Sequence, residues 1–239
     1  MTQPNIVLPG PVQTALDLLE TAGFEAFVVG GCTRDALLGD APHDWDITTS
    51  ALPEQTKTVF ADYRLIETGI KHGTVTILMD GLPLEITTYR TEGGYRDSRH
   101  PDWVKFVPHI REDLARRDFT VNAMAYSPTR GFADPFGGRE DLKNGILRTV
   151  RNPGQRFSED SLRILRGIRF ASRFRLTIEE ETKAAMENLA PLTDNLARER
   201  VFDELSRMLP TLSARDVVAF APVLSAVIPE LKPLIGFDQ

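Results

Sequence analysis

Residues 27–50 read FVVGGCTRDALLGDAPHDWDITTS, and this stretch says most about the fold. The run from Phe24 to Gly30 is short, apolar and rich in β-branched residues, which predicts a buried strand. Gly30 and Gly31 let the backbone turn and approach a bulky group closely. Thr33 can cap a short helix whose free N–H groups suit an anion. The stretch therefore predicts a strand, a tight turn and a helix in sequence.

A second strand is predicted over residues 43–50. Side chains two apart on a strand share a face, so Asp44 and Asp46 project side by side while Trp45 and Ile47 point the other way. Two adjacent carboxylates repel, and each raises the cost of ionising the other. A divalent cation removes that cost, and oxygen ligands at close range suit Mg²⁺, which keeps some waters and shares phosphate oxygens.

Each part of this pattern has an ordinary explanation. A glycine pair is usually a turn, and two acids one residue apart are usually solvated. The combination of strand, glycine pair, Arg34–Asp35 and paired acids on the next strand is much rarer. The phosphate-binding P-loop is excluded because no G-K-[ST] follows the glycines, and the dinucleotide fingerprint G-x-G-x-x-G is absent.

The composition is that of a globular protein. The chain has 239 residues, of which 41% are hydrophobic and 26% charged, enough for one large or two small domains. The single cysteine, Cys32, excludes an internal disulfide framework and fits a reducing compartment; we interpret it as a packing residue. Neither a signal peptide nor an apolar run of membrane-spanning length is recognisable, so we expect a cytoplasmic protein without membrane contact.

The formal net charge of -6 argues against a nucleic-acid partner, because phosphate backbones attract lysine and arginine. The charge is uneven, however: segment 148–175 contains eight arginines and only two acids, Glu159 and Asp160. This basic stripe is either a footprint for nucleic acid or a solvated helix face, and arginine rather than lysine favours phosphate or base contact.

The hydrophobic pattern divides the chain into an α/β region and a helical region. In the first, helices are expected near 11–22, 53–61 and 111–126. Strands are expected near 24–30 and 43–49, followed by a hairpin of Thr74–Met79 and Leu82–Arg90. From about 158 the pattern is purely helical, with segments near 158–173, 178–190, 197–209 and 213–227. Asn, Pro and Gly break the pattern near 151–154, which predicts a head domain over 1–150 and a neck domain over 151–239.

At this point the chain resembles a known family. GGCTRDALLG followed by DWDIT is similar to the head motif of class II tRNA nucleotidyltransferases, which include CCA-adding enzymes and bacterial poly(A) polymerases. Four later stretches match family motifs in the expected order: ARRDFTVNAMAY (115–126), DPFGGREDLKNGILR (134–148), EDSLRILRGIRF (159–170) and ARERVFDELSRML (197–209). The resemblance implies an α/β head of the polymerase-β-like type, a small mixed sheet flanked by helices, and an all-α neck.

The resemblance also implies a metal-dependent, template-independent transfer of CMP and AMP from CTP and ATP to a tRNA 3′ end. With two Mg²⁺ ions on Asp44 and Asp46 (Mn²⁺ being the alternative), one ion would activate the 3′-hydroxyl and the other would hold the triphosphate. Glu85 is either a cross-strand polar residue or the third carboxylate that commonly completes this cluster in the superfamily. The predicted catalytic residues are therefore Asp44, Asp46 and Glu85.

Further residues of the head are expected to bind the nucleotide. Gly30, Gly31 and Arg34 would contact the phosphates, although Arg34 and Asp35 could simply form a surface ion pair. The resemblance implies that Arg117 and Asp118 contact the nucleotide. Asn122 is a polar residue in an apolar run, and its partner is either a ribose hydroxyl or a backbone group.

Asp160 and Arg163 lie three residues apart on the helix predicted over 158–173, which makes them neighbours. They form either an intrahelical ion pair or an acceptor beside a donor fork, which matches the amino and ring-nitrogen edge shared by cytosine and adenine. Uracil and guanine would leave buried polar groups unpaired. The resemblance identifies this pair as the template that selects CTP and ATP. Arg166 and Arg169 continue the row as further nucleotide-binding candidates. Arg169 lies about half a turn around from Asp160 and is expected on phosphate or tRNA rather than on the base.

Segment 91–109 is long and polar, and loops of this kind are usually functional or disordered. In relatives it is the flexible loop needed for A addition, so we expect A addition here. The chain resembles a head-plus-neck portion, because relatives extend further, and no H…HD motif is visible. Two alternatives remain open: A-only addition or poly(A) synthesis within the same family, and a nucleotide-binding module without transfer activity.

Overall fold

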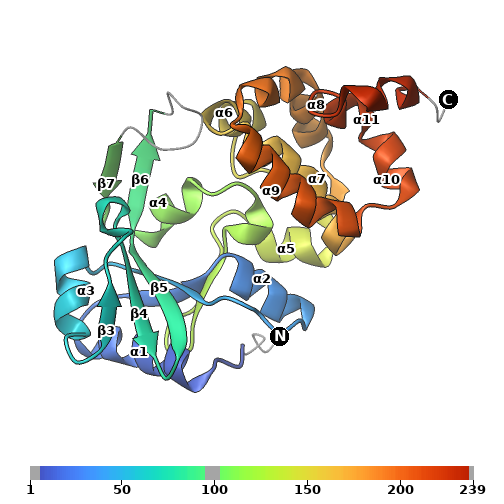
Figure 1. The fold of residues 1–239 in the computed structure, drawn as a ribbon. Coiled ribbons are helices and arrows are strands. Elements are labelled where there is room, and N and C mark those ends of the chain that lie inside the picture. Colours follow the sequence, from blue (N-terminus) through green and yellow to red (C-terminus); the bar gives the residue numbers. More distant parts are fainter. Residues whose placement is uncertain (1–5, 95–102, 237–239) are drawn as a thin grey trace. The chain divides into compact units, whose positions relative to one another are not determined.

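The computed structural model describes residues 6–94 and 103–236, and these separate into two compact units. We call Met1–Glu92 with Trp103–Arg139 the head unit, and Gly93–Asp102 with Glu140–Gln239 the helical unit. Figure 1 colours the head unit blue to green and most of the helical unit yellow to red. The domain division predicted at residue 150 stays a prediction.

The head unit is built on a seven-stranded mixed sheet of order β3-β4-β5-β2-β1-β8-β9. Figure 1 labels three of its strands, β3, β4 and β5. Strands β2 and β5 are parallel, and the other neighbouring pairs are antiparallel. The strands are β1 (Ala26–Val29), β2 (Asp46–Thr49), β3 (Arg64–Ile66), β4 (Thr74–Met79), β5 (Leu82–Thr88), β8 (Ala125–Ser127) and β9 (Gly131–Ala133). A separate two-stranded sheet pairs β6 (Arg90–Gly93) with β7 (Trp103–Phe106).

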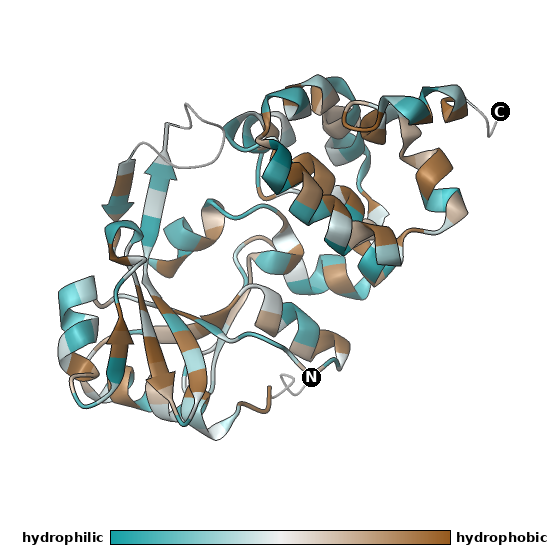
Figure 2. Ribbon diagram, in the orientation of Figure 1, coloured by the Kyte–Doolittle hydropathy of each residue, from teal (hydrophilic) through white to brown (hydrophobic). Residues whose placement is uncertain are grey.

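Helices cover this sheet and bury its apolar side chains. They are α1 (Gly10–Thr21), α2 (Gly31–Leu38) and α3 (Pro53–Val59). The head unit also contains α4 (Ile110–Ala115) and 3-10 turns at Ile70–His72 and Thr120–Asn122. Figure 2 shows the central strands largely in the hydrophobic colour. Strand β4 alternates between buried and half-buried residues, which is the period-two pattern of a strand with one face in the core. The core includes Leu16, Ile47, Phe60 and Ile86.

The sequence predicted the first strands and the β4–β5 hairpin correctly, but three expectations for the head were wrong. Thr33 does not cap α2; Gly30 is the cap residue and Thr33 donates to the Val28 carbonyl at 3.3 Å. The alternation in PLEITTYR predicted Tyr89 on the same face as Glu85, but Tyr89 follows the end of β5, is fully buried, and its N–H donates to the Thr49 carbonyl at 2.8 Å. Residues 111–126 do not form one helix: α4 ends at Ala115, and the chain re-enters the sheet as β8.

The helical unit contains α6 (Pro153–Glu159), α7 (Leu162–Phe174), α8 (Glu180–Leu189), α9 (Arg198–Met208), α10 (Ala214–Ala219) and α11 (Ala221–Leu224), joined by 3-10 turns. Helix α5 (Gly138–Lys143) crosses the unit boundary. The expected helix over 158–173 is two helices broken at Asp160, whose φ of -146° and ψ of 101° are extended. The expected helix over 213–227 breaks at Phe220, because Pro222 cannot donate to a continuing helix.

The helical region is not purely helical, because two short strands pair in parallel, β10 (Ile146–Leu147) with β11 (Thr177–Ile178). Among the residues that the structure describes, no helix has both the length and the apolar character needed to cross a membrane.

Candidate functional site

Two of the three predicted catalytic carboxylates lie at the start of β2. Asp46 is the first residue of that strand and Asp44 precedes it by two, and both are exposed. The residues between and after them, Trp45 and Ile47, are 5% and 0% exposed. The predicted alternation is therefore present: the apolar side chains anchor the strand in the core and leave the two carboxylates on the open face.

Glu85 lies on the neighbouring strand, directly opposite Asp46 in the parallel register of β2 and β5. Desolvation by the surrounding protein raises the pKa of Asp46; the charges of Glu85 and Asp44 raise it further, and Arg117 opposes them. The three predicted carboxylates thus act on one another, and each added negative charge makes ionisation of Asp46 more costly.

A bound cation would offset this repulsion, and carboxylate oxygens are the ligands that hard divalent ions prefer. Within the described part of the chain, no group of three or more His, Cys, Asp or Glu side chains is arranged to hold a metal ion. Asp44 and Asp46 fit a two-ligand site completed by water and phosphate oxygens. The role of Glu85 as a third ligand stays a prediction.

The structure brings two distant segments of the head together beside these carboxylates. Gly30 has φ +81°, and a Cβ built on it would lie 2.9 Å from Nη1 of Arg117. That conformation suits glycine, and the missing side chain leaves room for the guanidinium. Gly31 begins α2 one residue later. The bulky group that approaches the glycine pair is therefore the guanidinium of Arg117.

A chain of buried polar side chains continues from α2. Arg34 is 5% exposed and binds Asp35 with two donor nitrogens at 2.8 and 2.6 Å. Its third nitrogen donates to the side-chain oxygen of Asn122, whose amide nitrogen donates to Asp118 at 3.0 Å. Arg34–Asp35 is thus a buried pair and not a surface one, and the partners of Asn122 are side chains of other predicted site residues.

Asp113 on α4 was not identified from the sequence, yet it organises this side of the head. It is 0% exposed, accepts from the Arg90 N–H at 3.3 Å, and binds Arg116 at 2.9 Å and Arg117 at 3.3 Å. Burial alone would raise its pKa, but Arg116 and Arg117 hold the pKa below the usual value. Glu92 of β6 binds Arg116 at 3.2 Å, so the network ties β6 to α4.

The predicted base-reading residues lie in the helical unit, and their surroundings differ from the expectation. Asp160 lies between α6 and α7, where Arg200 of α9 reaches its two oxygens at 3.3 and 3.1 Å. Arg163 donates to the Arg156 carbonyl and to Glu159, both at 3.0 Å. Asp160 and Arg163 therefore do not share a helix, and each has a charged partner of its own.

The next two arginines of α7 face the protein. Arg169 is 7% exposed, forms an ion pair with Glu204 of α9 and lies 4.3 Å from the ring centroid of Phe170. Arg166 lies 5.1 Å from the same centroid. The contact of Arg169 with phosphate or tRNA stays a prediction, and its observed role is to join α7 to α9.

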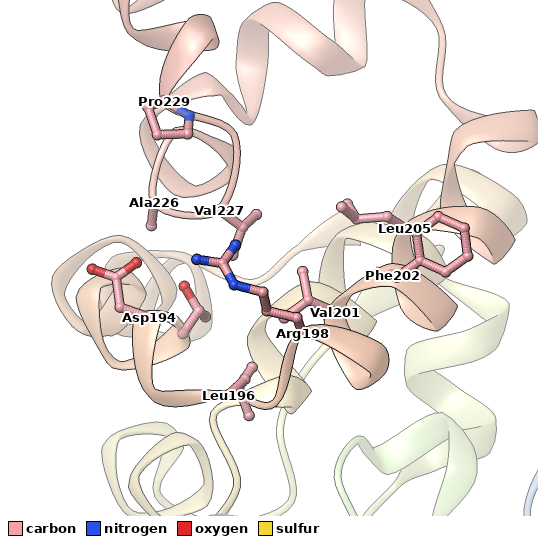
Figure 3. A pocket seen from close by; sticks show the side chains of 10 residues that line it. Asp194, Leu196, Arg198, Val201, Phe202, Leu205, Ala226, Val227 and Pro229 are labelled. Atoms are coloured by element: carbon pink, nitrogen blue, oxygen red, sulfur yellow. The ribbon is translucent and has the colours of Figure 1, made fainter.

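A pocket of about 470 Å³ lies elsewhere in the helical unit (Figure 3). Figure 3 shows Arg198, from the start of α9, extending towards Val227, with Phe202 and Leu205 on the same helix. None of the predicted nucleotide-binding residues lines this pocket.

The residues that the sequence analysis missed are charged and lie on helices. Asp113 follows Glu112 in a run that resembles an ordinary solvated face, and Arg200 and Glu204 occur in a stretch that the analysis used only as a family motif. Spacing was the available signal. Asp113 and Arg117 are four residues apart, as are Arg200 and Glu204, and residues four apart on a helix lie on the same face.

The mixed sheet, the carboxylates on its open face and the helical unit define the class, a polymerase-β-like nucleotidyltransferase fold. A family model described as the poly A polymerase head domain matches residues 26–148. A second model, described as the probable RNA and SrmB-binding site of polymerase A, matches residues 175–219. The chain belongs to the poly(A) polymerase head domain family, and this membership implies dependence on a divalent metal ion.

The chain is also similar to proteins named CCA-adding enzymes. It is 50% identical over 193 residues to the one from Lactobacillus helveticus, which covers 81% of this chain and 48% of the relative. The crystal structure of the Bacillus stearothermophilus CCA-adding enzyme in complex with CTP matches with 38% identity and a TM-score of 0.80, over 90% of this chain and 52% of that one. The Thermotoga maritima enzyme complexed with tRNA-CCA matches with 27% identity and a TM-score of 0.78, over 94% and 54%.

The chain spans about half the length of the curated relatives it matches.

Proposed function

We propose that this protein is a tRNA nucleotidyltransferase that transfers CMP and AMP from CTP and ATP to the 3′ end of tRNA. The observation that carries the proposal is the pairing of Asp46 with Glu85 across β2 and β5, beside Arg117. Carboxylates on a rigid sheet next to a cation suit phosphoryl transfer, in which positioning and electrostatics supply most of the catalysis.

The residues of the head divide into two roles under this proposal. Asp44 and Asp46 hold two Mg²⁺ ions, which when bound would supply charge neutralisation at the reacting phosphate and a lowered pKa for the attacking hydroxyl. Arg117 faces the negative charge of the triphosphate. Arg34, held by Asp35 and Asn122, orients the loop of Gly30 and Gly31. The Gly30 N–H donates to the Met124 carbonyl at 3.1 Å, so the Gly31 N–H is the backbone group that would contact the phosphates.

In the helical unit, Asp160 accepts a hydrogen bond from the exocyclic amino group of cytosine or adenine, and Arg163 donates to the adjacent ring nitrogen. Uracil and guanine present the reverse order, so both would leave polar groups of the protein unpaired. The similarity to an enzyme crystallised with CTP supports this assignment. A cytoplasmic location belongs to the same proposal, and the single, buried Cys32 is consistent with it.

To test the proposal, the full chain is incubated with Mg²⁺, a tRNA that lacks its last three nucleotides, and either labelled CTP or labelled ATP. We expect incorporation of both nucleotides, lost in Asp46→Asn and kept in Asp62→Ala, an exposed aspartate outside the site. Incorporation of ATP alone would indicate A-only or poly(A) synthesis, which the poly A polymerase description of the family favours. Nucleotide binding without any incorporation would leave a binding module and overturn the transfer.

A further inference from the structure

The carboxylate of Asp160 is held by protein groups on both of its oxygens. Oδ1 accepts from the Leu162 N–H at 3.1 Å and from Nη2 of Arg200 at 3.3 Å, while Oδ2 accepts from the same Arg200 nitrogen at 3.1 Å. The side chains of Asp160 and Arg200 are both 17% exposed. The carboxylate is therefore fixed but still open to solvent on one side.

We propose that Arg200 is a positioning residue for base selection: it fixes the Asp160 carboxylate so that one oxygen is aimed at the amino group of cytosine or adenine. This inference rests on the function proposed above and adds a residue to it. It concerns only groups within the helical unit, because Asp160 and Arg200 both belong to that unit.

The Asp160 carboxylate has one acceptor direction left for a base. An ionised carboxylate offers about four acceptor directions. Among the described residues, two are taken at Oδ1 and one at Oδ2, so one direction remains at Oδ2. A base that presents an N–H there gains a charge-assisted hydrogen bond. A base that presents a carbonyl oxygen meets a second acceptor, and the held carboxylate cannot rotate away without losing the bonds to Arg200.

A second ion pair, between α7 and α9, helps to distinguish this role of Arg200 from simple support of the fold. The pair of Arg169 and Glu204 joins α7 to α9, and both of its side chains are at most 8% exposed. That pair is more deeply buried than Asp160 and Arg200, which makes it the better candidate for holding the helices together. Arg200 therefore contributes orientation at a partly open site.

The test measures kcat/KM of the full chain for all four nucleoside triphosphates on a tRNA lacking its CCA end. We expect Arg200→Ala to lower the preference for CTP over UTP, and for ATP over GTP, by about tenfold, the lower end of what a hydrogen bond to a charged group contributes. Arg200→Lys restores the charge without the planar fork and should recover part of the preference. Arg198→Ala, an exposed arginine on the same helix, should leave it unchanged.

Two further variants separate positioning from folding. Glu204→Gln should lower thermal stability and reduce all four rates by the same factor. If Arg200 acts through Asp160, the double variant Asp160→Asn/Arg200→Ala should lose no more selectivity than Asp160→Asn alone. An Arg200→Ala protein that keeps its base preference, with or without lower stability, would overturn the inference and leave the proposed function standing. Absence of transfer by the unmodified protein would instead overturn the proposed function.

Discussion

Gly30 shows how a single missing side chain shapes the candidate site. Its φ of +81° is one that residues with a Cβ rarely adopt, and a Cβ there would lie 2.9 Å from Nη1 of Arg117, which would have to move. We expect Gly30→Ala to lower the free energy of unfolding by about 1–3 kcal/mol, the usual cost of a residue held in such a conformation, and to displace Arg117. Urea denaturation measures the stability, and nucleotide binding reports the displacement.

The matched control is Gly10→Ala. A Cβ at Gly10 meets nothing within 4 Å and its φ is not positive, so alanine should be neutral or slightly stabilising there. Equal stability and equal nucleotide binding in Gly30→Ala and Gly10→Ala would show that the turn does not need glycine.

Asp46 leads to a prediction about pH. Its pKa in the folded protein is raised above the ordinary 3.8 by desolvation and by Glu85 and Asp44. At pH values just above 3.8, the folded state therefore binds more protons than the unfolded state. The contribution of Asp46 to stability falls as the pH rises from 3.8 through the raised pKa of the folded protein. Without divalent ions, Asp46→Asn should gain stability relative to the original protein between about pH 3.5 and pH 7.

Urea unfolding at the two pH values gives the comparison. Added Mg²⁺ should reverse the order at pH 7, because an ion that binds only the folded state stabilises it. If Mg²⁺ stabilised both proteins equally, Asp46 would not be a metal ligand.

The sequence allowed the carboxylates to be located because their signal is local. Asp44 and Asp46 alternate with buried Trp45 and Ile47, and strand geometry alone then sets their direction. The partners of Arg34 could not be predicted in this way. Asn122 lies 88 residues further on, and only the fold of the sheet brings the two together.

At the scale of elements, α4 depends on one buried charge. Asp113 is 0% exposed and binds Arg116, Arg117 and the Arg90 N–H. We expect Asp113→Asn to cost about 2–4 kcal/mol at pH 7, less than the roughly 3–5 kcal/mol for breaking a fully buried pair, because the arginine side chains remain 16% and 20% exposed.

The pH dependence of Asp113 has the opposite sign to that of Asp46. Its folded pKa lies below the ordinary 3.8, so its stabilisation is present above that value and is lost as pH falls through the folded pKa. The stability difference between Asp113→Asn and the original protein should therefore shrink when urea unfolding is repeated at lower pH. Glu112→Gln, at a half-buried position on the same helix, serves as the control, and a difference independent of pH would contradict the assignment.

Element boundaries were the least predictable part of the fold. Residues 111–126 have an apolar content that fits a helix, yet tertiary pairing ends α4 at Ala115 and places Tyr126 opposite Val28 in the sheet. The break at Asp160 has a similar origin, since contacts with Arg200 and the Leu162 N–H hold the extended residue. Local propensity is a weak guide where such contacts decide.

At the scale of the whole molecule, the arginine stripe of 148–175 has acquired a structural explanation. Arg156 and Arg163 bind Glu159, and Arg169 binds Glu204. Arg148 binds Asp141 and Glu179. These ion pairs lie within the helical unit, and the contact of the stripe with nucleic acid stays a prediction. The excess of arginine over acids within the segment was misleading because three of the partner acids, Asp141, Glu179 and Glu204, lie outside it.

The last prediction concerns segment 91–109, whose central residues 95–102 lie outside the described part of the chain. The paired strands β6 and β7 form its two ends, and Glu92 and Arg90 connect β6 to the Asp113 network. Replacing 95–102 with Asn-Gly, which suits a two-residue hairpin, would shorten the segment and keep both strands. We expect AMP addition to fall by a larger factor than CMP addition, because the resemblance to relatives links this loop to A addition.

The comparison requires two substrates, a tRNA lacking only its last A and a tRNA lacking all of CCA, with CTP and ATP supplied separately. As a control for the β6 anchor, Glu92→Gln keeps the length and weakens the ion pairs to Arg90 and Arg116. If length alone matters, Glu92→Gln should leave the ratio of the two rates unchanged while the shortened chain alters it. Equal losses of CMP and AMP addition in the shortened chain would contradict the role of the segment, because a loop that only supports the fold affects both nucleotides alike.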